Sequence, residues 1–353
     1  MTYNLIRSRI LRCALLAFLT LQAIFATEAW AVIIPTVPIG NAGNAGEVQA
    51  SGTFGEVDYA YRIGTTEVTN AQYVEFLNAK AKTDPYFLWS SVMGSTSRGG
   101  ITRSGGFGNY TYSLKANFAD KPVNFTNWYD AARFANWLHN GQGSGDTETG
   151  SYTLLGGTAI PSNASSITRN PGATWVLPST DEWYKAAYYD PTLNGGSGGY
   201  WDYPTRSNTV PTMATASSVG DISNPGANIA NYGSGAEWNS VSGNVTTVGS
   251  AGPLSQSYYG TSDQGGNVVE WTDTLSGSYR GFTGGGYSDV SGYLWSGIET
   301  VGEPQIANPA IGFRVAFVPE PSSLTLFGGG LLINGLWRRL RRSPNCHHNC
   351  GNQ

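Results

Sequence analysis

The sequence has few of the side chains that perform redox and metal chemistry. It contains three cysteines and three histidines in 353 residues, and Cys13, Cys346 and Cys350 all lie near the chain ends. Residues 32–318 therefore hold no cysteine and a single histidine, His139. This part of the chain forms no disulfide and offers no thiol nucleophile, and a facial triad that binds iron would need a second histidine.

Positive charge is also scarce. Residues 32–318 contain 13 Lys and Arg against 22 Asp and Glu, a net charge of −9. Because nucleic-acid affinity comes from neutralised phosphates, this balance argues against a nucleic-acid partner. Glycine is abundant, with 47 residues, yet the chain also has 11 Trp and 20 Tyr. We therefore expect a loop-rich domain with large buried aromatic side chains, and not a disordered chain.

The first 31 residues have the pattern of a secretory signal. Basic residues between positions 7 and 12 precede an apolar run over 14–25, and small residues around Ala31 form a cleavage site. We predict a signal peptide over 1–31 that is cleaved after Ala31. The alternative is an uncleaved membrane anchor, for which the run is shorter than the ~20 residues of a spanning helix.

The C-terminal end carries three elements in a fixed order. Pro319, Glu320 and Pro321 precede an apolar stretch over 322–337, and four arginines follow within 338–342. This order resembles the PEP-CTERM sorting tail of bacteria. The resemblance implies recognition and removal by an exosortase-type peptidase, with an ordinary C-terminal anchor as the alternative. We expect a sorting and transmembrane tail over 319–342, followed by a cytoplasmic tail over 343–353. This C-terminal tail is the only part of the mature chain that is expected to contact the membrane.

Local patterns between the ends predict an α+β domain. A leader is expected over 32–55 and one loop-rich domain over 56–318. A capping-box pattern over residues 69–72 predicts one helix, and a second pattern over 179–182 predicts another that begins at Ser179. A further helix is expected after Thr126 or Asn127. Residues 90–108 are expected to form a long loop. Strands are predicted over 59–63, 268–271, 286–287 and 311–317.

Six short segments in order identify a family resemblance. They are Glu67-Val68-Thr69-Asn70, Pro122-Val123 with Trp128, Leu177-Pro178-Ser179 with Glu182-Trp183, residues 266–271, residues 284–287 and Gly312-Phe313-Arg314. Together they resemble the formylglycine-generating-enzyme, or sulfatase-modifying factor, family over residues 56–318. The resemblance implies a large variant of the C-type lectin fold, loop-rich and low in regular secondary structure.

The chemistry of that family depends on residues that this chain lacks. Active members hold copper with two cysteines, and the matching positions here are Asp289 and Leu294. A carboxylate and an isobutyl group cannot replace two soft thiolates. A second branch of the family uses iron held by three histidines, which His139 alone cannot provide. No copper or iron site is visible, and no catalytic residue is predicted.

The resemblance also implies structural calcium. One site of the family corresponds to Asp263, Gly266, Val268 and Glu270, which offer hard oxygen ligands of the kind calcium binds. The alternative for this segment is a glycine turn that leads into a strand. A second site begins with a pair that matches Asn228 and Ile229.

These expectations favour an exported surface or matrix protein. Its domain is predicted to be a calcium-stabilised binding module for extracellular glycans or other surface proteins. Loop aromatics such as Tyr293 and Trp295 suit such contacts, although such residues more often fill an irregular core. One alternative is a metal-dependent oxidoreductase or protein-modifying enzyme of the same family with a divergent active site. Another is a structural matrix protein without a specific ligand.

Overall fold

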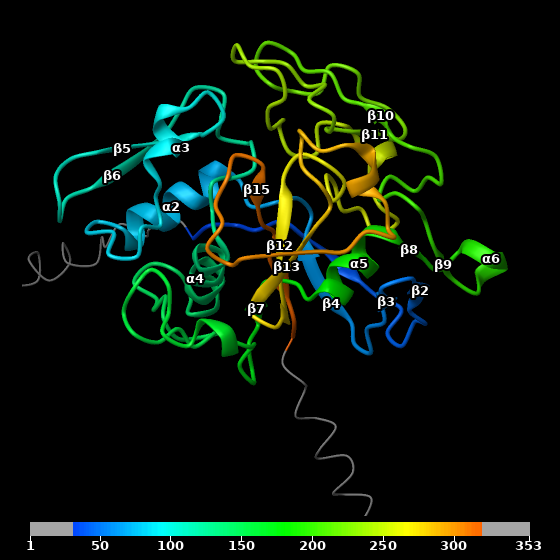
Figure 1. Cartoon of the computed structure of the whole chain (residues 1–353), viewed down its shortest axis with the longest axis horizontal. Helices are drawn as coiled ribbons and strands as arrows, with labels where there is room; N and C mark the ends of the chain where they lie inside the picture. The colour runs from blue at the N-terminus through cyan, green and yellow to red at the C-terminus, as the bar shows by residue number, and fades with distance from the viewer. Residues whose placement is uncertain (1–30, 320–353) are drawn as a thin grey trace, which may run out of the picture.

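Two four-stranded sheets form the framework of the domain (Figure 1). The computed structural model describes residues 31–319. The first sheet has the order β1-β4-β16-β7, with β1 Thr36–Ile39, β4 Tyr61–Gly64, β7 Trp175–Val176 and β16 Ala316–Phe317. The second has the order β14-β13-β12-β15, with β12 Val269–Ser276, β13 Tyr279–Thr283, β14 Thr300–Gly302 and β15 Ile311–Gly312.

Short two-stranded ribbons and small helices make up much of the remaining regular structure. The ribbons are β2 Glu47–Gln49 with β3 Gly52–Phe54, β5 Ile101–Ser104 with β6 Thr111–Leu114, β8 Tyr189–Asp190 with β9 Gly199–Tyr200, and β10 Thr212–Met213 with β11 Ile229–Ala230. The short helices are α3 Ser91–Ser95, η2 Ala164–Ser166, α6 Leu193–Gly196, η3 Pro253–Ser255 and η4 Ser291–Leu294.

The three longest helices begin where the sequence predicts. They are α2 Asn70–Lys80, α4 Trp128–His139 and α5 Thr180–Tyr188. Each begins with a complete capping box, in which the N-cap side chain and the third helical side chain satisfy backbone N–H groups reciprocally. For α4 the N-cap is Asn127, which decides between the two positions expected from the sequence.

Four sequence expectations are corrected by the structure. The expected leader contributes β1, which pairs with β4, so part of it belongs to the folded domain. The expected loop over 90–108 contains both α3 and β5. Residues 286–287 lie outside the strands, and a turn begins at Tyr287. The strand expected over 311–317 is interrupted, because β15 and β16 belong to different sheets.

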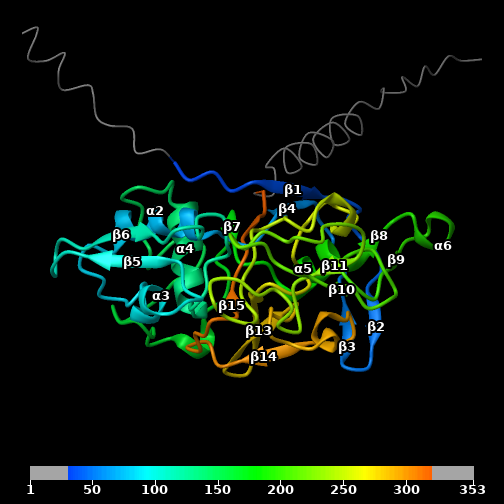
Figure 2. The same ribbon diagram turned by 90° about the horizontal axis from the view of Figure 1, so that it is seen from above.

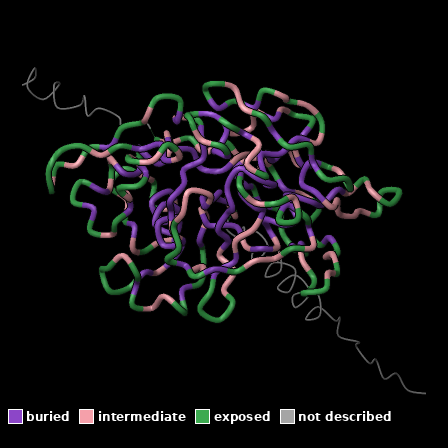
Figure 3. Tube along the Cα trace, turned by 45° about the horizontal axis from the view of Figure 1, so that its top comes forward, coloured by how far each residue is buried: buried purple, intermediate pink, exposed green. Residues whose placement is uncertain are grey.

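The core lies where the long helices meet the sheets, and the loops lie around it (Figure 3). Its largest fully buried aromatic side chains include Trp128, Trp183 and Trp271. Both ends of the described chain emerge on the same side of the domain (Figure 2). The predicted signal sequence and nearly all of the sorting tail lie outside the described residues. Within 31–319, no helix is long and apolar enough to cross a membrane.

Candidate functional site

A buried ion pair connects two of the sequence segments that define the family resemblance. Arg314 donates to both oxygens of Glu270, at 2.5 and 2.6 Å, and both side chains are fully buried. The indole Nε1 of Trp183 donates to Glu270 Oε2 at 2.7 Å. Because buried charges need a partner, these residues form a structural unit that holds α5 against β12. Arg314, the last residue of the Gly-Phe-Arg segment, thus has a structural role.

Two further carboxylates interact electrostatically with this pair. We refer to Glu67, Asp263, Glu270 and Arg314 together as the charge network. Glu67 is 1% exposed; its Oε1 accepts from Asn267 at 3.0 Å, whereas its Oε2 has no hydrogen-bond partner. Burial raises the pKa of Glu67 well above its usual value, and the charges of Asp263 and Glu270 add to the effect. The charge network has three carboxyl groups for one guanidinium.

The residues predicted to bind calcium lie in this region, but several already have protein partners. Glu270 gives both oxygens to Arg314, and Asp263 Oδ2 accepts from the Gly249 N–H at 2.5 Å. Gly266 has a φ of +93°, and a Cβ there would lie 2.2 Å from the Asn231 carbonyl oxygen. A close backbone approach therefore accounts for the glycine. Val268 packs in an apolar cluster with 1% exposure.

The two predicted calcium segments meet at one small cavity. Ile229 and Asp263 both line a cavity of about 10 Å³, together with hydroxyl and amide side chains that include Thr205 and Gln264. This volume suits about one water-sized occupant. Asn228 already has partners at both ends of its side chain: its Oδ1 accepts from Thr205 and its Nδ2 donates to residues 209 and 210.

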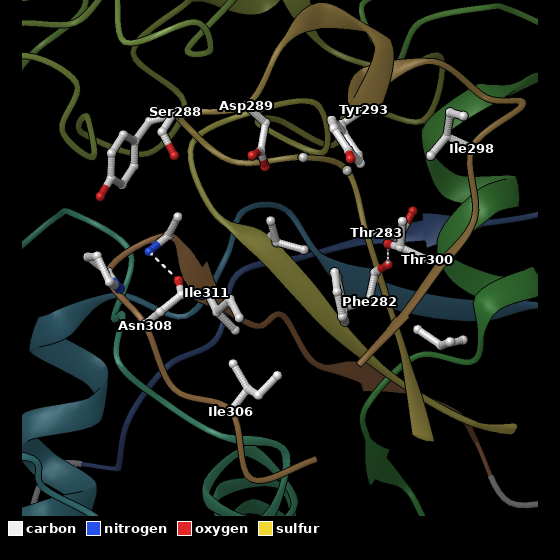
Figure 4. A pocket seen from close by; sticks show the side chains of 17 residues that line it. Phe282, Thr283, Ser288, Asp289, Tyr293, Ile298, Thr300, Ile306, Asn308 and Ile311 are labelled. Atoms are coloured by element: carbon white, nitrogen blue, oxygen red, sulfur yellow. Dashed lines mark hydrogen bonds between the residues drawn. The ribbon is translucent and has the colours of Figure 1, made fainter. Parts of the chain in front are cut away.

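A larger pocket opens between the second sheet and the two segments that connect β13 to β14 and β14 to β15. This central pocket has a volume of about 570 Å³. In Figure 4, Ser288, Asp289 and Tyr293 lie along one side, and Ile306, Asn308 and Ile311 lie on the opposite side. Its other lining residues are Val269, Phe282, Thr283, Gly284, Gly285, Tyr287, Ile298, Thr300, Val301, Pro309 and Ala310.

Apolar side chains at the mouth of the central pocket are open to solvent. Tyr293 is 47% exposed, Val301 50% and Ile306 39%. Sequence reasoning singled out Tyr293 but missed Val301 and Ile306, because the irregular segment around them has no hydrophobic periodicity. Exposed apolar side chains that gather around a pocket with a few polar groups are typical of ligand-binding sites.

The two positions that match the copper ligands of the family have separate surroundings. Asp289 lines the central pocket, where its Oδ2 accepts from the Gly286 N–H at 2.8 Å. Leu294 is fully buried and packs with Tyr203, Ala230 and Tyr232. Asp289 thus fixes a turn at the pocket wall, and Leu294 fills the core beneath it.

The lining of the central pocket combines apolar side chains with a few hydroxyl, amide and carboxyl groups. Its residues include no Cys, His, Lys or Arg. Burial raises the pKa of Tyr287 to about 12, so its hydroxyl stays protonated at neutral pH and does not act as a base. Within residues 31–319, no cluster of three or more His, Cys, Asp and Glu side chains is arranged to hold a metal ion.

The fold and its motifs place the protein among loop-rich α+β proteins of the formylglycine-generating-enzyme and C-type lectin type. The chain belongs to the family defined by the sulfatase-modifying factor enzyme 1-like domain, whose model matches residues 37–318. Residues 317–342 match the PEP-CTERM protein-sorting motif. This motif marks a protein for export to the cell envelope or surface and for sorting by an exosortase.

Several solved structures are similar to this chain, and one of them, with a TM-score above 0.5, supports the fold. The Treponema denticola variable protein 1 is 22% identical with a TM-score of 0.51, over 82% of this chain and 97% of that one. CarF is 24% identical with a TM-score of 0.47, over 81% and 98% of the two chains. PvdO from Pseudomonas aeruginosa is 15% identical with a TM-score of 0.40, over 81% and 92%. A search of curated proteins finds no significant match.

Proposed function

We propose that the exported domain is a binding module and that its ligand inserts an apolar group into the central pocket. The observation that carries this proposal is the structural role of Asp289 and Leu294, the two residues at the positions that match the copper ligands. One is a carboxylate that holds a turn, and the other is a core leucine. The pocket remains, with an apolar floor that includes Val269 and Ile311 and an exposed apolar mouth.

The pocket surface favours a surface protein as the partner. An extended peptide could place an apolar side chain between Val301 and Ile306 while its polar groups meet Ser288 and Asp289. Extracellular glycans are the second candidate, favoured by the exposed rings of Tyr293 and, next to it in the chain, Trp295. Neither partner requires a redox metal in the site.

Arrays of peptides and glycans probed with the full-length chain test this function. We expect probes with an accessible apolar group to bind, and Val301→Asp to weaken that binding about tenfold or more, because a carboxylate must then be desolvated. Val210→Asp is the matched control, since Val210 is 51% exposed and lies outside the central pocket. Bound copper or iron at one per purified chain, or equal effects of the two substitutions, would contradict the proposal.

We further propose that calcium stabilises the domain near Asp263. The surplus of carboxylates in the charge network, the unpartnered Glu67 Oε2 and the small polar cavity beside Asp263 are the features that fit a cation. Asp263 and backbone carbonyls of its segment would hold the ion, because Glu270 is already paired with Arg314.

Chelation provides the calcium test. We expect EDTA to lower the melting temperature by several degrees. Free calcium at about 100 times its Kd adds about 2.7 kcal/mol to the free energy of unfolding, and chelation removes this contribution. Asp263→Asn should remove this response, whereas Asp221→Asn, at an exposed position, should keep it. Glu270→Ala is unsuitable, because it leaves Arg314 unpaired whether or not calcium binds. An unchanged melting temperature in EDTA would rule out the site.

A further inference from the structure

A second pocket lies beside the β5–β6 hairpin, apart from the central pocket. This hairpin pocket has a volume of about 640 Å³. Three segments form most of its walls: the loop over 83–91, the hairpin residues 103–110 and the start of α4. Ala307 closes one side, next to the Ile306 of the central pocket. Nothing in the proposed function uses this pocket.

Asp130 on α4 presents an unsatisfied acceptor at the hairpin pocket. The side chain is 2% exposed; Oδ2 accepts from the Asn127 N–H at 3.0 Å as part of the capping box, and Oδ1 has no hydrogen-bond partner. A capping box needs one carboxylate oxygen, so it does not account for the second. Leaving a buried carboxylate oxygen without a donor is costly, and native structures do so at few positions.

The charges around Asp130 leave it without a counterion. Arg103 pairs with Asp84 at 3.5 Å and is stacked between the rings of Trp89 and Tyr110, at 4.2 and 4.1 Å. Behind the pocket, Arg133 pairs with Glu148 through two hydrogen bonds of 2.7 and 3.1 Å. With both arginines matched to other carboxylates, no cation within residues 31–319 pairs directly with Asp130, so burial raises its pKa and keeps the carboxyl group protonated near neutral pH. A cationic ligand that binds beside it would supply the missing positive charge and favour loss of that proton.

Two exposed aromatic side chains flank the entrance. Phe87 is 73% exposed and Phe107 is 77% exposed, and both line the hairpin pocket. Phe87 also has a φ of +56°, which is rare for a bulky residue and costs free energy that a solvent-exposed ring does not recover. These rings offer an apolar surface to an alkyl chain and π faces to a cation.

We propose that the hairpin pocket binds a primary ammonium group on an alkyl stem, as in a lysine side chain of a partner polypeptide. The ammonium donates to Oδ1 of Asp130, and the stem lies against Phe87 and Phe107. A charge-assisted hydrogen bond then satisfies the buried oxygen, and the stem covers the exposed rings.

Matched small probes test this assignment on the purified full-length chain. Nα-acetyl-lysine methylamide and Nα-acetyl-norleucine methylamide differ mainly in the ammonium group, and saturation-transfer NMR measures both. We expect saturable binding of the lysine amide and about tenfold weaker binding of the norleucine amide. Glucosamine is the third probe, because an amino sugar carries the same ammonium on a rigid ring. Tighter binding of glucosamine than of the lysine amide would overturn the lysine assignment.

Two variants separate recognition from folding. Asp130→Asn keeps an oxygen for the Asn127 N–H, and we expect it to reduce lysine-amide binding to the norleucine level while circular dichroism stays unchanged. Phe87→Ala, at an exposed site, should weaken both amides by similar factors. Val301→Asp, in the central pocket, should leave both unchanged. Equal binding of the two amides, no saturable binding of the lysine amide, or unchanged lysine-amide binding by Asp130→Asn would overturn the proposal.

Discussion

Replacing Glu270 with glutamine is expected to lower the free energy of unfolding by about 3–5 kcal/mol. Arg314 is fully buried, and the carboxylate is its only charged partner closer than 4 Å among the described residues. The glutamine side chain would keep the shape but lose the charge, so that the dehydrated guanidinium would have no charged group in direct contact and only the more distant Glu67 and Asp263 near it. For a domain of this size the melting temperature should fall by about 10 °C.

Urea unfolding and calorimetry measure this effect, with Glu303→Gln as the control because Glu303 is exposed. The double variant Glu270→Gln/Arg314→Met should recover part of the loss, since removing both partners leaves no unpaired charge. If Glu270→Gln were as stable as Glu303→Gln, the ion pair would not have the structural role that its geometry indicates.

Raising the pH from 5 to 7.5 is expected to destabilise the domain, and Asp130 alone contributes about 3 kcal/mol of this loss. Burial raises the pKa of Asp130 from 3.8 to about 8, with a smaller contribution from the charge of Asp84. Burial and the charge of Asp181 raise the pKa of the partly buried Glu299 from 4.5 to about 7. The folded state therefore binds protons that the unfolded chain has already released.

The direction of the effect follows from these values. Below pH 4 both states are protonated and the contribution of Asp130 is complete; it is lost as the pH rises toward 8. Carboxyl groups whose pKa is lowered, Asp146 and Glu182, titrate below this window. Lys185, whose pKa burial lowers to about 8, titrates mainly above it.

Melting temperatures across pH 5 to 7.5 test this prediction. We expect a fall of about 10 °C for the parent chain. Asp130→Asn and Glu299→Gln should each reduce the slope, because their side chains no longer titrate, and Asp130→Asn should have the larger effect. The raised pKa values of the buried Glu67 and Asp263 account for part of the slope that remains. A melting temperature that stays constant or rises from pH 5 to 7.5 would contradict the prediction that Asp130 and Glu299 are protonated in the folded domain.

The sequence predicted features that depend on neighbouring residues. The starts of α2, α4 and α5 follow from capping residues three positions apart, which act within one helical turn. The ordered motifs predicted the family and the fold type, which the domain match over 37–318 confirms. Counting residue types was also sufficient to show that residues 32–318 contain no thiol.

Strand pairing was less predictable, because it depends on partners far away in the chain. Residues 311–317 look like one strand, yet β15 pairs with β12 while β16 pairs with β4 and β7. Similarly, β1 lies in a segment without a strong strand pattern and is stabilised by pairing with β4. Local propensity is weak in such short strands, and tertiary pairing decides them.

The roles of the site residues were decided by the tertiary structure. The sequence alone determined that residues 32–318 hold no cysteine and that this region is acidic, because these follow from residue types. Only the fold decided that Glu270 meets Arg314, 44 residues away, and that Asp289 reaches a pocket while Leu294 enters the core. Burial and charge pairing act through space between distant segments, so composition and spacing along the chain do not specify them.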